Sequence, residues 1–239
     1  MTDHDNDLRT PSARRSFLAR VGAATAAFGA TFGVAGLARA GAQTPAPPAG
    51  DPRWQPARHP QDDWLDQVPG KHRFFFDVTT TPGLVDAMQF VGNFYEANKG
   101  DYDLSPSDLA VIVCLRHNAA PFGYNDAMWK KYGETLARRA EYVDPRNKDV
   151  TPAANPYTPV GAADAARGRG LAGLVRNGAR FAVCNISTQG IAGMIARAVD
   201  GTRDEIYKEL AANLIPSARL VPAGILAVNR AQERGYSIT

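Results

Sequence analysis

A continuous apolar run, Leu109 to Leu115 (LAVIVCL), lies near the middle of the chain. A strand with one face in water alternates apolar and polar side chains, and this run has no polar position. It therefore predicts a strand buried on both faces, which is typical of a parallel sheet covered by helices on each side. The rest of the chain has to supply that cover.

Shorter segments on either side alternate between strand and helix patterns. Further strands are predicted at residues 72–78, 180–186 and 219–224, with an edge strand at 236–239. Apolar residues at helical spacing predict helices over 84–100, 125–132, 162–177, 191–199, 202–214 and 225–234. Thr202 and Glu205 have the spacing of a capping box at the start of one of them. This order predicts a three-layer α/β domain at 71–239 with a mostly parallel sheet of four to five strands.

Two proline-rich segments interrupt this pattern. Residues 43–70 contain seven prolines and predict an extended, poorly ordered arm, in which Trp54 and Trp64 tack the chain down. Residues 134–160 are polar and contain four prolines, so they predict a long loop excursion from the domain rather than a second domain.

The first 42 residues have the organisation of an export signal. Arg14 and Arg15 directly precede Ser-Phe-Leu, an uncharged stretch runs from Val21 to Leu37, and small residues suited to cleavage follow at 38–42. The paired arginines indicate the twin-arginine route, with the Tat translocase as partner during export and the periplasm as destination. An uncleaved membrane anchor is the alternative, although the stretch is short and weakly apolar for a span of about 20 residues.

Removing this leader changes the charge of the chain. It holds five arginines and three aspartates, so 22 of the 27 basic and 21 of the 24 acidic residues remain in the other 197. Such a balance leaves no basic surface for nucleic acid or membrane lipid. The two cysteines make no metal-binding motif, and Thr79–Gly83 lacks the glycines of a nucleotide-binding loop. The sequence therefore predicts no cofactor and no metal.

Candidate functional residues follow the predicted strands. Arg116 and His117 follow the second strand, Cys184 and Asn185 the third, and Gly224 the fourth. The carboxyl ends of parallel strands meet at one edge of a sheet, where ligands bind in open α/β folds. A thiol beside an imidazole favours nucleophilic sulfur chemistry, so Cys184 and His117 are candidate catalytic residues. Arg116, Asn185 and Gly224 are candidate substrate-binding residues.

Each of these residues also has a structural interpretation. Cys184 on an apolar strand can be a small buried residue, and Cys114, inside the apolar run, is predicted to fill the core. A disulfide between them requires neighbouring strands in a suitable register. His117 can make a structural hydrogen bond, and Asp77 can either join the same edge or cap a turn. Metal or haem binding through His117 and Cys184 ranks last, because no spacing motif supports it.

Four segments resemble one known family. Residues 112–117 and 125–133, together with 181–185 and 220–232, are similar to a Tat-exported branch of the DsrE/DsrF-like family. The similarity covers most of residues 71–239. It implies a flavodoxin-like three-layer fold and homo-oligomers. For well-studied members it implies sulfur-carrier or sulfurtransferase chemistry through a cysteine persulfide in the cytoplasm.

Within that resemblance, only Cys184 corresponds to the family's reactive cysteine. The export signal, the proline-rich arm and the excursion all depart from the family pattern. Two hypotheses follow: an exported protein that handles sulfur at Cys184, or a non-catalytic module that binds a small ligand or a partner, with Cys184 as packing. A small-molecule or protein sulfur donor remains unidentified by the sequence.

Overall fold

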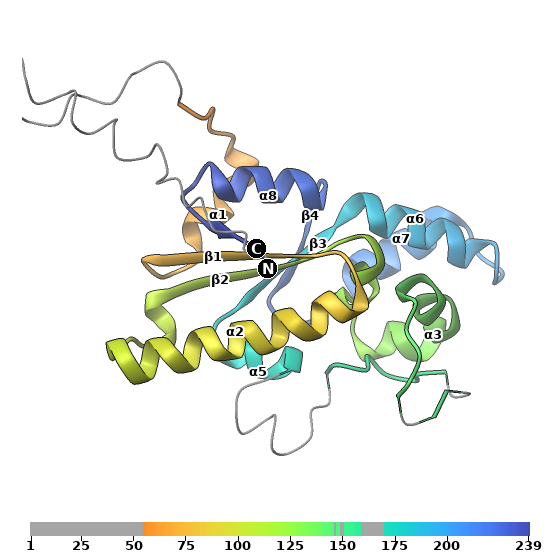
Figure 1. Cartoon of the computed structure of the whole chain (residues 1–239). Helices are drawn as coiled ribbons and strands as arrows, with labels where there is room; N and C mark the ends of the chain where they lie inside the picture. The colour runs from red at the N-terminus through yellow and green to blue at the C-terminus, as the bar shows by residue number, and fades with distance from the viewer. Residues whose placement is uncertain (1–54, 146, 149–150, 159–169) are drawn as a thin grey trace, which may run out of the picture. The chain divides into compact units, whose positions relative to one another are not determined.

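The computed structural model describes residues 55–145, 147–148, 151–158 and 170–239 (Figure 1). The predicted leader with Arg14 and Arg15 lies outside these residues. So do the first part of the predicted arm, residues 43–54, and residues 159–169. All the described residues belong to one unit of the chain.

Five parallel strands form a single sheet in the order β4-β3-β2-β1-β5. The strands are β1 (His72–Val78), β2 (Leu109–Leu115), β3 (Arg180–Cys184), β4 (Ala218–Val221) and β5 (Ser237–Ile238). All seven residues of β2 are buried, which confirms the prediction made from its apolar run. β2 pairs with β1 and β3, so it is central in the sheet as well as covered on both faces.

Helices cover both faces of this sheet, so the predicted three-layer α/β fold is confirmed. One apolar cluster joins Val111 and Val113 of β2 to α2 (Thr81–Tyr102), α3 (Asp126–Ala140), α5 (Gly170–Arg176), α6 (Asn185–Ala196) and α7 (Arg203–Ala212). A second cluster joins Ala110 and Ile112, on the opposite face, to α1 (Trp64–Gln67) and α8 (Gly224–Gln232). Figure 1 shows α8 and α1 on one side of the strands, with α2 and α5 on the other. Three 3-10 turns, η1 (Pro60–Asp62), η2 (Pro106–Asp108) and η3 (His117–Gly123), complete the described elements.

The strand order differs from that of flavodoxin, which is 2-1-3-4-5. From β1 to β4 each new strand is added on the same side, and the connecting helices all lie on one face. The last connection, through α8, runs over the other face and places β5 beside β1. The β4–β5 connection runs across the sheet in the opposite direction to the earlier connections and over the opposite face. Because both are reversed, the crossover stays right-handed, as nearly all such connections are. The likeness to flavodoxin is therefore in the layers and not in the order.

Helix α3 continues past the predicted end at Gly133. Its regular geometry breaks at Tyr132 (φ −125°, ψ 17°), and a second helical segment continues to Ala140. Gly133 lets another part of the chain approach, because a Cβ on it would lie 2.3 Å from the carbonyl oxygen of Pro152. The excursion therefore begins at residue 141 and not at 134. Gly133 is the position of a close backbone contact and not the end of the helix.

The described part of the excursion is fixed to the domain by Asn155. This fully buried side chain donates from Nδ2 to the carbonyl oxygens of Phe122 and Tyr124, both at 2.9 Å. Its backbone N–H donates to Asp126 Oδ1 at 3.0 Å. These bonds satisfy backbone groups at the junction between η3 and α3, so the excursion completes this part of the core.

The prediction of a poorly ordered arm is wrong for residues 60–68. These residues form η1 and α1, and they bury Trp64, Leu65 and Val68 against the sheet face that α8 covers only in part. The Tyr236 hydroxyl donates to the Leu65 carbonyl oxygen at 2.6 Å. Proline content indicated an extended chain, but the apolar residues between the prolines are needed as cover for the sheet.

Ion pairs also attach this segment to the domain. Asp66 accepts from Arg73 Nη1 at 3.0 Å and from Arg234 Nε at 3.2 Å, and Arg230 Nε lies 3.5 Å from Asp62 Oδ2. Burial pushes the pKa of Asp66 upward, but the hydrogen bonds from Arg73 and Arg234 and the positive charges of Arg234 and Arg58 outweigh it, so the net pKa is lowered.

Replacing Leu65 with Ala is expected to destabilise the fold by about 2–5 kcal/mol, because it removes a fully buried side chain and leaves a cavity. Urea unfolding monitored by circular dichroism measures the change. Val85→Ala on the exposed face of α2 is the matched control, with an expected effect within about 0.5 kcal/mol. Equal effects of the two variants would show that α1 is not part of the core.

Asp66→Asn is expected to destabilise the protein at neutral pH and to lose that effect in acid. A carboxylate whose pKa is lowered in the folded state adds stability above its ordinary pKa, 3.8. This contribution disappears as the pH falls through the folded-state value. The difference in unfolding free energy from the wild type should therefore be modest at pH 7, because Asp66 is half exposed, and should shrink as the pH falls below 3.8. A pH-independent difference, or the same trend in Asp86→Asn on α2, would contradict this role.

Candidate functional site

The carboxyl edge of the sheet brings the predicted site residues together. β3 is followed by α6 on one face, whereas its neighbour β4 is followed by α8 on the other. Adjacent strands whose connections leave to opposite faces form the position where open α/β sheets bind ligands. Cys184 and Asn185 reach this edge from β3, and Gly224 reaches it from β4. Arg116 and His117 follow β2.

Cys184 ends β3 and caps the N-terminus of α6. Its Sγ accepts a hydrogen bond from the Ser187 backbone N–H at 3.4 Å, the bond that a serine or aspartate side chain usually accepts at this position. The N–H donor and the partial positive charge of the helix N-terminus both favour negative charge on the sulfur. Only 6 % of Cys184 is exposed, so a reactant must approach the edge of the sheet closely.

The backbone at Cys184 is fixed by a buried pair of hydroxyl groups. The Thr188 hydroxyl donates to the Cys184 carbonyl oxygen at 3.0 Å and lies 2.9 Å from the Tyr124 hydroxyl oxygen. Burial raises the pKa of Tyr124 above its ordinary value, so its hydroxyl keeps its proton. The sequence analysis identified neither Tyr124 nor Thr188. Tyr124 is 60 positions from Cys184 in the chain, and no motif marks it.

Cys114 is fully buried on the α8 face of β2, which confirms its predicted place in the core. Its Sγ lies 3.9 Å from the carbonyl oxygen of Gly224. Burial, followed by the negative charge of Asp77, raises the pKa of the Cys114 thiol well above its ordinary value. A protonated thiol in this position is a poor nucleophile.

The two cysteines are free, although their strands are neighbours. Cys114 pairs with Ala182, which places Cys184 two residues farther along β3. With a strand spacing of about 4.8 Å and a rise of about 3.3 Å per residue, their Cα atoms are about 8 Å apart. A disulfide needs less than about 7 Å, so this register does not form the bridge without backbone movement.

Arg116 is held by Asp77. Its Nε and Nη2 donate to the two carboxylate oxygens of Asp77, both at 2.7 Å, in a bidentate ion pair. The hydrogen bonds from Arg116 to Asp77 raise the pKa of the guanidinium, so it stays charged. Asp77 thus joins the edge of the sheet, one of its two predicted roles. Its charge offsets that of Arg116, which leaves Arg116 less available for a substrate than the sequence suggested.

Gly224 provides the space in which Arg116 lies. A Cβ on Gly224 would be 2.6 Å from Cδ and 2.7 Å from Cβ of Arg116, which is closer than such atoms approach. The arginine stem therefore crosses directly over the start of α8. A glycine is therefore needed at position 224 for packing, whether or not Gly224 has the predicted substrate-binding role.

His117 lies beside α6 with its imidazole in solvent. Its backbone N–H donates to Ser187 Oγ at 3.1 Å, and its φ of 54° is in the left-handed region. Among the described residues, no hydrogen bond joins the imidazole to Cys184 Sγ. The structure thus brings His117 to the first turn of α6 through its backbone, but it does not pair the base with the thiol.

Asn185 is the first residue of α6. Its Oδ1 is buried and, within the described part of the chain, accepts no hydrogen bond. Buried acceptors without a donor are uncommon in native proteins. This orphaned acceptor lies on the residue next to Cys184.

Other site types find little support in the described ranges. No group of three or more His, Cys, Asp or Glu side chains there is arranged to hold a metal ion. None of the helices in those ranges is both long and apolar enough to cross a bilayer. No protein-family model, curated protein or solved structure matches the chain.

Gly224→Ala is expected to lower the unfolding free energy by about 1–3 kcal/mol, because the new methyl group collides with the stem of Arg116. Gly190→Ala in α6 is the control: nothing lies within 4 Å of the added Cβ, and the change should stabilise the helix by about 0.5–1 kcal/mol. Thermal and urea unfolding of both variants test this. A neutral Gly224→Ala would mean that Arg116 does not rest on this residue.

Proposed function

We propose that this chain is an exported sulfur carrier of DsrE/DsrF-like type, with Cys184 as the sulfur-bearing thiol. The observation that carries the proposal is the position of Cys184 Sγ at the N-terminus of α6, where the Ser187 N–H donates to it. The family resemblance, in which only Cys184 corresponds to the reactive cysteine, supports the same assignment. Cys114 is the contrasting thiol, because burial holds it protonated.

The proposed step is the transfer of a sulfane sulfur. Cys184 loses its proton to solvent, and its thiolate attacks the outer sulfur of a persulfide donor, R–S–SH. The donor S–S bond breaks, and its electron pair leaves with R–S⁻. Cys184 then carries –S–SH, and an acceptor thiolate removes the outer sulfur in the same way. No external oxidant or reductant is consumed.

The surrounding groups have defined roles in this proposal. The first turn of α6 stabilises negative charge on the sulfur, and the orphaned Asn185 Oδ1 is an acceptor beside it. His117 is a solvent-exposed base at the same edge, and movement of its side chain is needed before it can serve Cys184. Arg116, paired with Asp77, contributes mainly to shaping the edge.

The place of action is part of the proposal. The twin-arginine signal with Arg14 and Arg15 supports export by the Tat translocase to the periplasm, with a membrane anchor as the alternative. The resemblance supports a homo-oligomer. A carrier in that compartment needs a donor and an acceptor that are themselves outside the cytoplasm.

A non-catalytic binding module is the second candidate. The low exposure of Cys184 favours it, as does the apolar character of the neighbouring helix starts: Ile186 is 65 % exposed on α6, and Ile225 is 61 % exposed on α8. On this hypothesis the edge binds a ligand or a partner, and Cys184 serves only as the cap of α6.

Treatment with a low-molecular-weight persulfide is expected to add one sulfur atom to the wild type and to Cys114→Ala, but not to Cys184→Ala. Intact-protein mass spectrometry measures the added sulfur, and peptide mapping after alkylation locates it. Release of the sulfur by a thiol acceptor should restore the original mass.

Cys114→Ala is the matched control, because it removes a thiol of the same sheet that is buried. Cys184→Ser keeps a capping oxygen for the Ser187 N–H and separates loss of the sulfur from loss of the cap. Sulfur uptake by Cys184→Ser, or modification of Cys184 only after unfolding, would overturn the carrier function and favour the binding module.

A further inference from the structure

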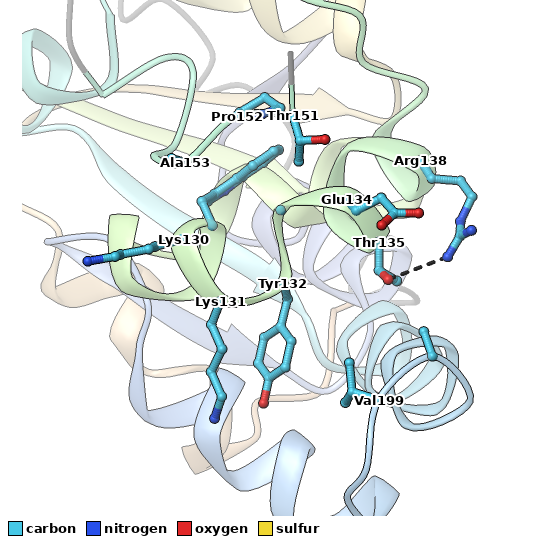
Figure 2. Close-up of a pocket in the computed structure, with 13 residues that line it drawn as sticks. Lys130, Lys131, Tyr132, Glu134, Thr135, Arg138, Thr151, Pro152, Ala153 and Val199 are labelled. Atoms are coloured by element: carbon cyan, nitrogen blue, oxygen red, sulfur yellow. Dashed lines mark hydrogen bonds between the residues drawn. The ribbon is translucent and has the colours of Figure 1, made fainter. Parts of the chain in front are cut away.

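A cavity of about 430 Å³ lies beside the break in α3, away from the Cys184 edge (Figure 2). It is bounded by α3, by residues 151–153 of the excursion and by Ala198 and Val199, which follow α6. Its volume is within the ~300–1,000 Å³ range of small-molecule sites. None of the residues lining it belongs to the proposed sulfur site.

The break in α3 forms one wall. Tyr132 leaves helical geometry, and Gly133 lets the Pro152 carbonyl approach to a distance that no side chain would permit. Asn155 secures this part of the excursion through its bonds to Phe122 and Tyr124. The wall is thus fixed by packing and hydrogen bonds, as expected of a cavity that exists before a ligand binds.

Three basic residues and one acidic residue line the cavity. One of the bases, Lys131, is neutralised: its Nζ lies 2.6 and 2.8 Å from the carboxylate oxygens of Glu209, to which Tyr132 also donates at 2.6 Å. Within the described ranges, Lys130 and Arg138 form no ion pair with a carboxylate. Figure 2 shows Lys130 directed away from Arg138, so Arg138 is the cation on the Thr135 side of the cavity.

Arg138 presents its guanidinium beside a hydroxyl group. Figure 2 shows it turned toward Thr135, to whose Oγ1 its Nη2 donates over a long 3.4 Å. Such a weak bond is easily replaced by the two parallel bonds that a guanidinium makes with a carboxylate. Val199, 42 % exposed, lines the cavity with apolar surface from the segment that follows α6.

We propose that this cavity binds a small organic carboxylate, with its anionic end at Arg138 and Thr135 and its apolar body against Val199. The Arg138 guanidinium, which forms no ion pair in the described ranges, matches the single charge of a monoanion, and the mixed lining matches a molecule with one charged end. The site is independent of the sulfur chemistry, because it shares no residue with the Cys184 edge.

Isothermal titration calorimetry of the full chain with sodium benzoate, in a buffer free of carboxylates, tests the proposal. Benzoate should bind saturably, and benzamide, its neutral isostere, at least about tenfold more weakly. Arg138→Gln should reduce benzoate affinity about tenfold or more, since it removes a charged hydrogen-bonding partner. Val199→Asp, which places a negative charge among the lining residues, should reduce it as well.

Lys208→Gln is the matched control: it removes an exposed positive charge of α7 that is not in the cavity and should leave the affinity unchanged. Melting curves confirm that each variant is folded, and the two test positions lie on different segments of the lining, so failure of one variant leaves the other informative. Absence of saturable binding up to about 10 mM benzoate overturns the site. Equal binding of benzamide, or an equal loss in Lys208→Gln, overturns the assignment to carboxylates.

Discussion

The burial of β2 on both faces is the constraint on which the rest of the structure depends. A strand that is buried on both faces needs a layer of helices on each face, and the two layers of this domain differ in size. Among the described elements, five helices pack on one face, and α8 and the short α1 pack on the other. The small side chains of Ala110, Cys114 and Ala182 on that second face let α8 lie close to the sheet. Residues 60–68 are ordered for the same reason, because without Trp64 and Leu65 part of the apolar sheet would be exposed to water.

The sequence predicted the elements whose pattern is local. β1 and β2 begin and end at the predicted residues, and the capping box at Thr202 and Glu205 starts α7 as expected. Errors arose where a distant contact decides the outcome. Gly133 was predicted to end a helix, but a glycine is needed there because the Pro152 carbonyl lies so close. The prolines of residues 43–70 predicted an extended chain, but the apolar residues between them pack on the sheet. The side of β1 on which β5 is added also depends on which face α8 covers, and no local pattern shows that.

The sequence predicted which residues lie at the candidate site but not which of their side chains interact. Topology alone brings the ends of β2, β3 and β4 to one edge, so Arg116, Cys184 and Gly224 could be grouped from sequence. Their partners depend on side-chain direction: Asp77 takes the Arg116 guanidinium, and the His117 imidazole turns to solvent. Positive potential at the sulfur therefore comes chiefly from the backbone of α6 and not from a basic side chain. On the sulfur-carrier proposal, such a site distinguishes donors and acceptors by access more than by charge.

The α1 layer also has a consequence for the order in which the molecule is assembled. Leu65 meets Tyr236 across 171 positions of the chain, and Asp66 meets Arg234 across 168. Contacts between such distant residues are slow to form, because a long loop must close before they contribute any stability. The face that holds Ala110 and Ile112 is thus expected to be the last to close, after the opposite layer has been built largely from nearer neighbours. Until that face closes, its apolar strand residues are exposed to water, so aggregation is expected from incompletely folded chains rather than from the native state.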